Sequence, residues 1–176
     1  LFGWERFEKG QVLVHGINVG KLTHRNIYTL RRFMGVVFQD YKLLPRRTVY
    51  ENVAFALRVM HYSRSRIHRQ VTQVLELVGL SEKVHHDVSE LSGGEQQRIC
   101  IARAIVNNPP ILLADEPTGN LDSRTGSNIV ELMFELNRTS STTLILVTHD
   151  KTLANRCDRI LGLDAGRLVT DERAAD

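Results

Sequence analysis

Two unbroken apolar runs constrain the fold of this chain more than any other feature of its sequence. They are residues 111–114 and 144–147, and each is followed at once by polar residues. A strand that is apolar at every position is typical of a parallel sheet whose two faces are both covered by helices. An amphipathic helical pattern separates the two runs, which gives the order strand, helix, strand. The sequence therefore predicts an α/β fold with a parallel sheet.

The composition is that of an ordinary globular domain. Of the 176 residues, 42% are apolar and 24% are charged, and glycine and proline together number 16, which excludes disordered and collagen-like chains. No apolar run approaches the roughly 18 residues that cross a bilayer. The net charge of +3 is too small to indicate a polyanionic partner. Of the two cysteines, Cys100 lies in an apolar helical pattern, where a buried, reduced thiol is expected.

A stretch of about fifty residues in the middle of the chain carries helix signals and almost no strand signal. Thr48 and Glu51 have the spacing of a capping box that starts a helix. A second helical pattern runs over residues 67–78 and meets Gly79, where a left-handed terminating residue is expected. The basic stretch 64–69 before it is expected to be an exposed helix junction, with nucleic-acid or lipid binding as the open alternative.

These signals predict a division of the chain into two parts. Residues 1–40 and 95–176 would form the α/β core. Residues 41–94 would form a helical lobe inserted into that core.

Polar side chains follow three of the predicted strands. Gln39 follows the run 36–38. Asp115 and Glu116 follow the run 111–114, and Thr148 and His149 follow the run 144–147. The carboxyl ends of parallel strands meet at one edge of a sheet, so these groups are expected to converge there.

Asp115 and Glu116 can serve one site only if the chain turns between them, because adjacent side chains on a strand point to opposite faces. Pro117 favours such a turn. A carboxylate at a strand end suits Mg2+, and a second carboxylate could orient or deprotonate a water molecule. The alternative is a pair of solvated acids without a function.

The octet 91–98 is the most specific segment of the sequence. Ser92 and Glu95 form a second capping box, which places Gly93 and Gly94 in the first turn of a helix. Glycine is costly there unless something must approach the backbone closely. Free N–H groups and the helix dipole make such a turn an anion-binding site, and phosphate is the expected ligand. The alternative is a purely structural glycine turn.

The octet resembles the signature sequence of the ABC-type ATPases, and the resemblance continues in order along the chain. Gln39 is similar to the Q-loop glutamine of that family, residues 111–116 to its Walker B strand, residues 119–122 to its D-loop and His149 to its switch histidine. Residues 38–45 and 48–54 most resemble the FtsE-type cell-division ATPases. Lipoprotein-release and macrolide-export ATPases share the tract 114–122 and remain open as alternatives.

The resemblance implies a P-loop NTPase-like parallel sheet and a Mg2+-dependent ATP hydrolase that works as a head-to-tail homodimer. The site residues that it implies toward ATP on the partner chain are Ser92, Gly93, Gly94, Glu95 and Asp122. Toward Mg2+ it implies Asp115 with Gln39, and the catalytic residues are Glu116 as general base, His149 on the γ-phosphate and Gln39 near the attacking water.

It also implies an integral-membrane partner, an FtsX-like subunit or a permease, to which the helical lobe would transmit dimer closure. The chain would lie in the cytoplasm at the inner face of the cell membrane. No nucleic acid is expected as a partner.

The chain departs from the family in one respect. The phosphate-binding pattern Gly-x-x-x-x-Gly-Lys-[Ser/Thr] does not occur, and its nearest string, residues 16–22, is one residue short and ends in Leu22 instead of a hydroxyl. The resemblance places the P-loop before Leu1. We therefore expect a fold that is incomplete at its N-terminus and a fragment that is inactive alone, and a non-catalytic module if Leu1 is a natural start.

Overall fold

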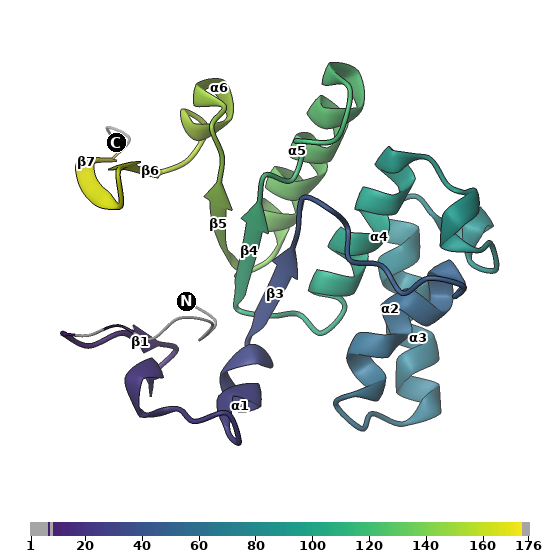
Figure 1. Ribbon diagram of the computed structural model, residues 1–176. Coiled ribbons are helices and arrows are strands. Elements are labelled where there is room, and N and C mark those ends of the chain that lie inside the picture. The colour runs from purple at the N-terminus through teal and green to yellow at the C-terminus, as the bar shows by residue number, and fades with distance from the viewer. Residues whose placement is uncertain (1–6, 8, 174–176) are drawn as a thin grey trace.

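The computed structural model describes residue 7 and residues 9–173, and its centre is a three-stranded parallel sheet. The strands are β3 (Met34–Val37), β4 (Ile111–Asp115) and β5 (Thr143–Val147), in the order β3-β4-β5 (Figure 1). Both pairs are parallel, with Val37 opposite Ala114 and Asp115 opposite Val147. The predicted α/β fold is confirmed.

The helices of the described residues are α1 (Ile27–Arg31), α2 (Val49–Arg58), α3 (Arg64–Leu77), α4 (Gly93–Ile105), α5 (Ser123–Thr139) and α6 (Lys151–Ala154), with short 3-10 helices at Val19–Lys21, Ser81–Lys83 and Val88–Glu90. Helices α4 and α5 pack against one face of the sheet, and α2 and α3 lie outside α4 (Figure 1). The main hydrophobic core fills the space between these four helices and the sheet.

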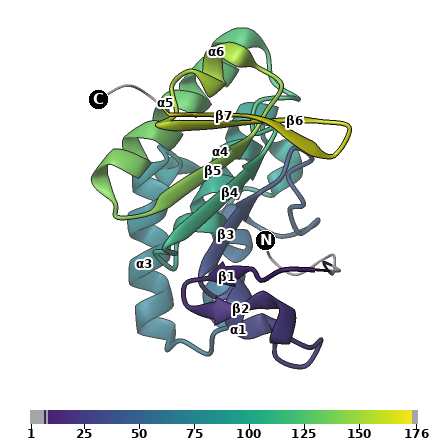
Figure 2. The ribbon, with the colours of Figure 1, turned by 90° about the vertical axis from the view of Figure 1, so that its left-hand side faces the viewer.

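Two antiparallel hairpins complete the described chain. One pairs β1 (Leu13–Val14) with β2 (Ile17–Asn18), and the other pairs β6 (Arg159–Asp164) with β7 (Arg167–Arg173). Ala165 and Gly166 join β6 to β7 with φ of 45° and 77°, as a two-residue turn with positive φ at both positions requires. The sequence predicts this hairpin, because Asp164, Ala165 and Gly166 separate the strand-like runs 160–163 and 167–170. The structure confirms the prediction, and Figure 2 shows the hairpin crossing in front of the sheet.

The helix starts follow the predicted capping boxes. The Thr48 hydroxyl accepts the Glu51 N–H at 3.1 Å, and the Glu51 carboxylate accepts the Thr48 N–H at 3.0 Å. Ser92 and Glu95 make the same reciprocal pair at the start of α4. Gly79 has φ of 69° and follows α3, as predicted.

The expectation that the apolar strands are covered on both faces is wrong for the described residues. Leu112 and Ala114 are buried under α4 and α5, whereas Val147 is 56% exposed. Ile111 and Leu113 point to the other face and are half-buried against a small cluster around Leu30. The reason is that α4 and α5 lie on the same side of the sheet, so the described chain has no large helix for the opposite side.

The basic stretch 64–69 is not a junction, and this expectation is corrected. It forms the first turns of α3, which begins after Ser63, whose hydroxyl accepts the Arg66 N–H at 3.4 Å. The cap satisfies one donor of the helix end, and Ile67, Val71 and the apolar positions after them bury one face. One buried face is enough to hold a helix whose other side is basic.

Within residues 41–94 the structure contains α2, α3 and two 3-10 helices, joined across the segment by a bridge between Thr48 and Asp87. The division into a core of residues 1–40 and 95–176 and a lobe of residues 41–94 stays a prediction. No helix among the described residues is long and apolar enough to cross a membrane.

Candidate functional site

The acidic end of β4 turns where the sequence predicted a turn. Asp115 is exposed and is the last residue of the strand. Glu116 has φ of 43°, an uncommon value for a residue with a side chain, and its N–H still donates to Val147 O at 2.9 Å. The turn at Glu116 breaks the strand alternation, so both carboxylates can serve the same edge of the sheet.

Glu116 and His149 are in direct contact at this edge. The Glu116 carboxylate accepts the His149 backbone N–H at 2.9 Å and lies 2.8 Å from the His149 Nδ1. The glutamate side chain is 21% exposed and the imidazole is 85% exposed. The carboxylate is thus fixed in place, while the imidazole stands at the surface, where a phosphate could meet it.

Gln39 lies at the same edge, two residues beyond β3. A side-chain carbon built on Gly119 would lie 2.8 Å from the Gln39 Nε2, so the amide packs against the loop that follows Glu116. Asn120 Nδ2 donates to the Gln39 carbonyl at 2.8 Å. The structure therefore brings together four of the five polar residues that follow the predicted strands: Gln39, Asp115, Glu116 and His149.

The backbone that follows Gln39 is held by α4. Tyr41 and Lys42 both have positive φ, of 57° and 48°. Arg103 donates to the Lys42 carbonyl at 2.6 Å and to the Tyr41 carbonyl at 2.9 Å, and the Cys100 thiol donates to Tyr41 O at 3.0 Å. We call these three hydrogen bonds the α4 strap, because they hold a strained loop to a helix.

Burial shifts the pKa of both donor residues of the α4 strap. It raises the pKa of the Cys100 thiol to about 12, so the thiol stays protonated and can donate, as expected for a buried reduced cysteine. Burial also lowers the pKa of Arg103, but a guanidinium remains charged in proteins.

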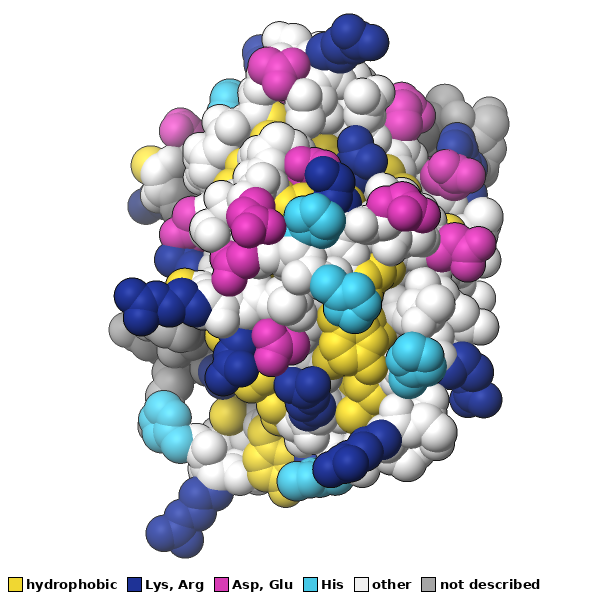
Figure 3. All heavy atoms as spheres, turned by 90° about the vertical axis from the view of Figure 1, so that its right-hand side faces the viewer, with side chains coloured by type: hydrophobic (Ala, Val, Ile, Leu, Met, Phe, Trp, Pro, Cys, Tyr) yellow, Lys and Arg dark blue, Asp and Glu magenta, His cyan; other side chains and the backbone are white. Residues whose placement is uncertain are grey.

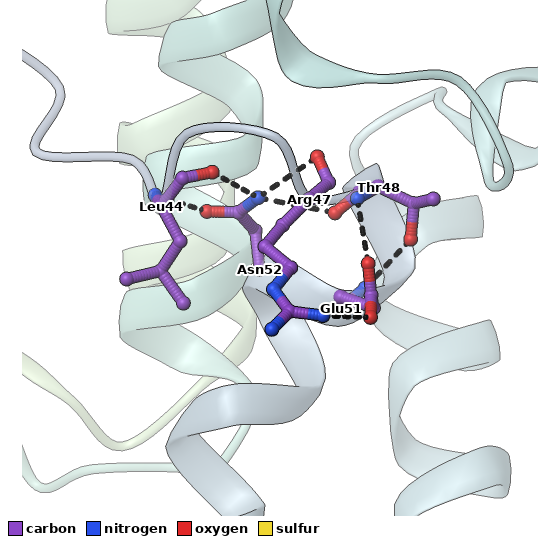
Figure 4. Close-up of polar contacts among 5 residues, drawn as sticks. All are labelled: Leu44, Arg47, Thr48, Glu51 and Asn52. Carbon is purple, nitrogen blue, oxygen red and sulfur yellow. Dashed lines mark hydrogen bonds and ion pairs between the residues drawn. The ribbon is translucent and has the colours of Figure 1, made fainter.

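Asn52 holds the next part of this loop. Its amide oxygen accepts the Leu44 N–H at 2.7 Å, and its amide nitrogen donates to the carbonyls of Leu44, Arg47 and Thr48 at 3.3, 3.5 and 3.1 Å (Figure 4). The side chain is fully buried. The connection from Gln39 to α2 is therefore fixed at both ends.

The start of α4 forms a second cluster. A side-chain carbon on Gly94 would lie 2.4 Å from the Thr125 Cγ2 in the first turn of α5. The same carbon on Gly93 would lie 2.9 Å from the Tyr41 Oη. Both glycines therefore pack closely against side chains, which would have to move to admit another residue, and the turn that carries Ser92 and Glu95 sits beside the start of α5.

Asp122 belongs to this second cluster. Its carboxylate caps α5 by accepting the N–H groups of Arg124 and Thr125 at 3.1 and 3.0 Å. Hydrogen bonding from the Thr125 side chain, and then from these N–H groups, holds the pKa of Asp122 below its usual value. Within the described residues, no hydrogen bond joins Ser92, Glu95 or Asp122 to the four residues at the strand edge.

Gln97 links the two clusters, and sequence reasoning missed it. This α4 residue is fully buried, and its Nε2 donates at 2.7 Å to the carbonyl of Pro117, next to Glu116. Its Oε1 has no hydrogen-bond partner among the described residues. The signal was available, because Gln97 lies between Gly94 and Ile101 at helical spacing, on a face that is otherwise apolar or small.

The strand-edge residues fit a magnesium ion that is coordinated partly by the protein and partly by nucleotide phosphates. Asp115 and Gln39 offer a carboxylate and an amide oxygen, and both residues are exposed. Mg2+ is usually held by one or two protein oxygens together with water and substrate phosphates. The described residues contain no group of three or more His, Cys, Asp or Glu that could enclose a metal by itself.

Comparison with known proteins identifies the family of the chain. Residues 1–119 match the family described as ABC transporter. The cell division ATP-binding protein FtsE of Streptococcus pneumoniae is 49% identical over 168 residues, which cover 95% of this chain and 73% of that protein. The lipoprotein-releasing system ATP-binding protein LolD of Xanthomonas campestris is 48% identical and covers 90% of this chain and 67% of its own length.

A solved structure is similar over nearly the whole chain. It is a dimeric, post-hydrolysis ATP-binding cassette bound to ADP and Pi, with a TM-score of 0.83 and 34% identity, and the match covers 98% of this chain and 76% of that one. The resemblance to the ABC-type ATPases is thus confirmed, including the similarity to FtsE. The chain belongs to the ABC transporter family, as an ATP-hydrolysing cassette of the FtsE-like type.

Proposed function

We propose that two copies of this cassette hold ATP between them and that the strand edge of one copy hydrolyses it. The observation that carries this proposal is the separation of the site residues into two clusters. The acids and His149 gather at the sheet edge. Gly93 and Gly94, whose N–H groups have no hydrogen-bond partner among the described residues, begin α4 in the other cluster. A second copy would bring its helix start to the phosphates above the first copy's acids.

In this arrangement Glu116 is the general base. Its carboxylate takes a proton from the water that attacks the γ-phosphorus, the bond from phosphorus to the bridging oxygen breaks, and ADP leaves with phosphate as the second product. The His149 backbone N–H and Nδ1 hold the carboxylate, and the imidazole Nε2 is left for the γ-phosphate. Gln39 orients the water through its amide.

Mg2+ would be held by Asp115 and Gln39. The ion would neutralise charge on the phosphates as it develops. The Ser92–Glu95 capping box fixes the start of α4, so the terminal phosphate of the partner's ATP would meet the positive end of the helix dipole there.

A groove beside the Gln39 loop is the proposed docking place for a segment of a membrane-protein partner. It has a volume of about 610 Å³ and lies between α1, β3, α2 and α4. Its apolar lining includes Phe38, Leu44 and Phe55, and Arg103 of the α4 strap also borders it. A segment seated there would contact the loop that follows Gln39, so a movement of Gln39 would be transmitted to it through this loop.

The similarity to FtsE supports a role in cell division, at the inner face of the cell membrane with an FtsX-like partner. The 48% identity to LolD supports lipoprotein release as the second candidate. Affinity purification of the full-length protein from its own cells, followed by identification of the membrane protein that copurifies, separates the two.

The test of the hydrolytic site is Glu116→Gln in the full-length protein. The amide keeps the shape of the side chain but cannot accept the water proton, so we expect steady-state ATP hydrolysis to fall by about 100-fold or more. ATP binding, measured by equilibrium dialysis, should be retained, and an ATP-bound dimer should accumulate on gel filtration.

The matched control is Glu172→Gln in β7, which makes the same chemical change on an exposed residue far along the chain. It should hydrolyse ATP at the normal rate. Normal turnover by the Glu116→Gln protein would remove Glu116 from its proposed role.

A further inference from the structure

Two segments of this chain carry no acidic residue. Residues 9–39 contain five lysines and arginines, residues 52–75 contain four, and neither segment contains aspartate or glutamate. The rest of the chain has 14 basic and 20 acidic residues. The small net charge of the chain therefore hides a strong separation of charge.

The two segments meet in the folded molecule. Asn107, just after α4, donates to the Arg32 carbonyl at 3.3 Å and accepts the Tyr62 hydroxyl at 3.1 Å. Arg32 caps the end of α1, and Tyr62 lies in the connection between α2 and α3. Figures 1 and 2 both show α1 and this connection at the same end of the molecule, away from the carboxyl ends of the strands.

This end presents its cations to solvent. The basic end, as we name it, consists of Arg25, Arg31, Arg32, Arg58, Arg64, Arg66 and Arg69, all of them exposed. Arg66 lies over the Tyr62 ring at 3.8 Å from its centroid, and Arg32 lies over Tyr28 at 5.0 Å. A guanidinium stacked on a ring by its face can still donate from its N–H edge to oxygen acceptors. One donor of Arg66, Nε, goes to Gln70 Oε1 at 3.1 Å. On the face seen in Figure 3, Lys and Arg gather toward this end and Asp and Glu toward the other.

Exposed apolar side chains stand among these cations. Tyr28 is 51% exposed and Val59 is 56% exposed, and both line the groove described above together with Arg31 and Arg32. Apolar and aromatic groups mixed with arginine are typical of surfaces that lie at the boundary between water and lipid. A surface that binds duplex nucleic acid would instead present cations and polar groups to the phosphates, without such exposed apolar side chains.

We propose that the basic end binds the anionic headgroups of a phospholipid bilayer directly. Charge complementarity supplies the attraction, since each arginine near an anionic leaflet adds to binding. The position of the groove gives the orientation of the protein on the bilayer, because a membrane-protein segment seated between α1 and α2 puts the flanking arginines nearest to the lipid. This step rests on the proposed function. The cassette would then hold the membrane at two kinds of contact, one with protein and one with lipid.

The test is flotation of the full-length protein, without any membrane partner, on vesicles that contain 30% phosphatidylglycerol in phosphatidylcholine. The variant is Arg64→Gln with Arg69→Gln, on the exposed side of α3. The control is Lys151→Gln with Arg167→Gln, which removes the same charge from α6 and β7. We expect the first pair to weaken binding by about 30-fold, from about fivefold per arginine, and the control pair to change it little.

Binding should vanish on pure phosphatidylcholine and fall steeply with salt. Equal loss in both variant pairs would overturn the proposal, since it would show attraction by net charge alone. Absence of vesicle binding would also overturn it, as would binding to a 20-base-pair DNA duplex that is tighter than binding to vesicles. ATP hydrolysis measured on the same samples distinguishes failure of this proposal from failure of the proposed function. The Arg64 and Arg69 variants leave the catalytic residues intact, so their ATP hydrolysis should not follow their vesicle binding.

Discussion

Asn52 decides the shape of the loop that follows Gln39 through one buried amide. The loop residues Leu44 to Thr48 have backbone groups that face inward, and a buried backbone group without a partner costs free energy. One side chain satisfies an N–H and three carbonyls of this loop. Only an amide has both the donors and the acceptor that this position needs.

Replacing Asn52 by alanine should therefore lower the free energy of unfolding by about 3 kcal/mol, because several buried groups lose their partner. Asn52→Asp should also destabilise, since a carboxylate would face three carbonyls and could donate to none. Urea unfolding of the purified protein measures both changes.

The control for this change is Asn128→Ala, which makes the same substitution on the exposed side of α5. It should change the stability by less than about 0.5 kcal/mol. Equal effects at the two positions would show that the hydrogen bonds of Asn52 contribute nothing.

At the scale of elements, the α4 strap connects helix α4 to the loop that follows Gln39. Helix α4 begins at the signature turn with Ser92 and reaches Cys100 and Arg103 about two to three turns later. These two residues hold Tyr41 and Lys42, next to Gln39. A shift of α4 on nucleotide binding would therefore move the Gln39 loop with it.

We expect Arg103→Gln to reduce kcat for ATP about tenfold while leaving KM nearly unchanged, because the loop would lose two hydrogen bonds and Gln39 its fixed position. Arg103→Lys keeps a donor and should recover part of the rate. Hydrogen exchange should rise in residues 39–47 and stay unchanged in α5. A rise of exchange throughout the protein would instead indicate general destabilisation and would contradict a positioning role.

At the scale of the whole molecule, the proposed function explains the separation of the two clusters by a second copy. Asp has favourable interactions at the start of a helix, so Gly93→Asp should leave the monomer folded. It would place a negative charge where the proposed partner's γ-phosphate lies. We expect the ATP-dependent dimer to disappear on gel filtration and ATP hydrolysis to fall with it.

Ser65→Asp puts the same side chain in the first turn of α3 and serves as the control, with normal dimer formation. If the Gly93→Asp protein dimerises normally with ATP, the helix start does not face a partner's phosphate. Circular dichroism of both variants confirms that each is folded.

Much of the site could be predicted because its signals are local. A capping box acts over three residues, so Ser92 with Glu95 and Thr48 with Glu51 could be predicted from spacing alone. The strand ends could be predicted because parallel strands bring their carboxyl ends to one edge, and this placed Gln39 and His149 in the same region.

Other parts could not be predicted, because they depend on contacts between residues far apart in the chain. Arg103 and Lys42 are 61 positions apart, and Gln97 and Pro117 are 20 apart. The first turns of α3 were missed for a different reason. A highly basic stretch has low apolar content, and the packing of Ile67 and Val71 outweighs that signal only in the folded protein.

The sequence by itself determined the α/β class, the helix starts, the final hairpin and the residues that gather at the strand edge. Each of these depends on periodicity, turn chemistry or the geometry of parallel strands, which act over a few residues. Only the tertiary structure decided that the sheet of the described chain is covered on one face, that Arg103 and Asn52 hold the Gln39 loop, and that two carboxylate-free segments form one basic end. These features arise from long-range packing, whose partners no local pattern of residues can name.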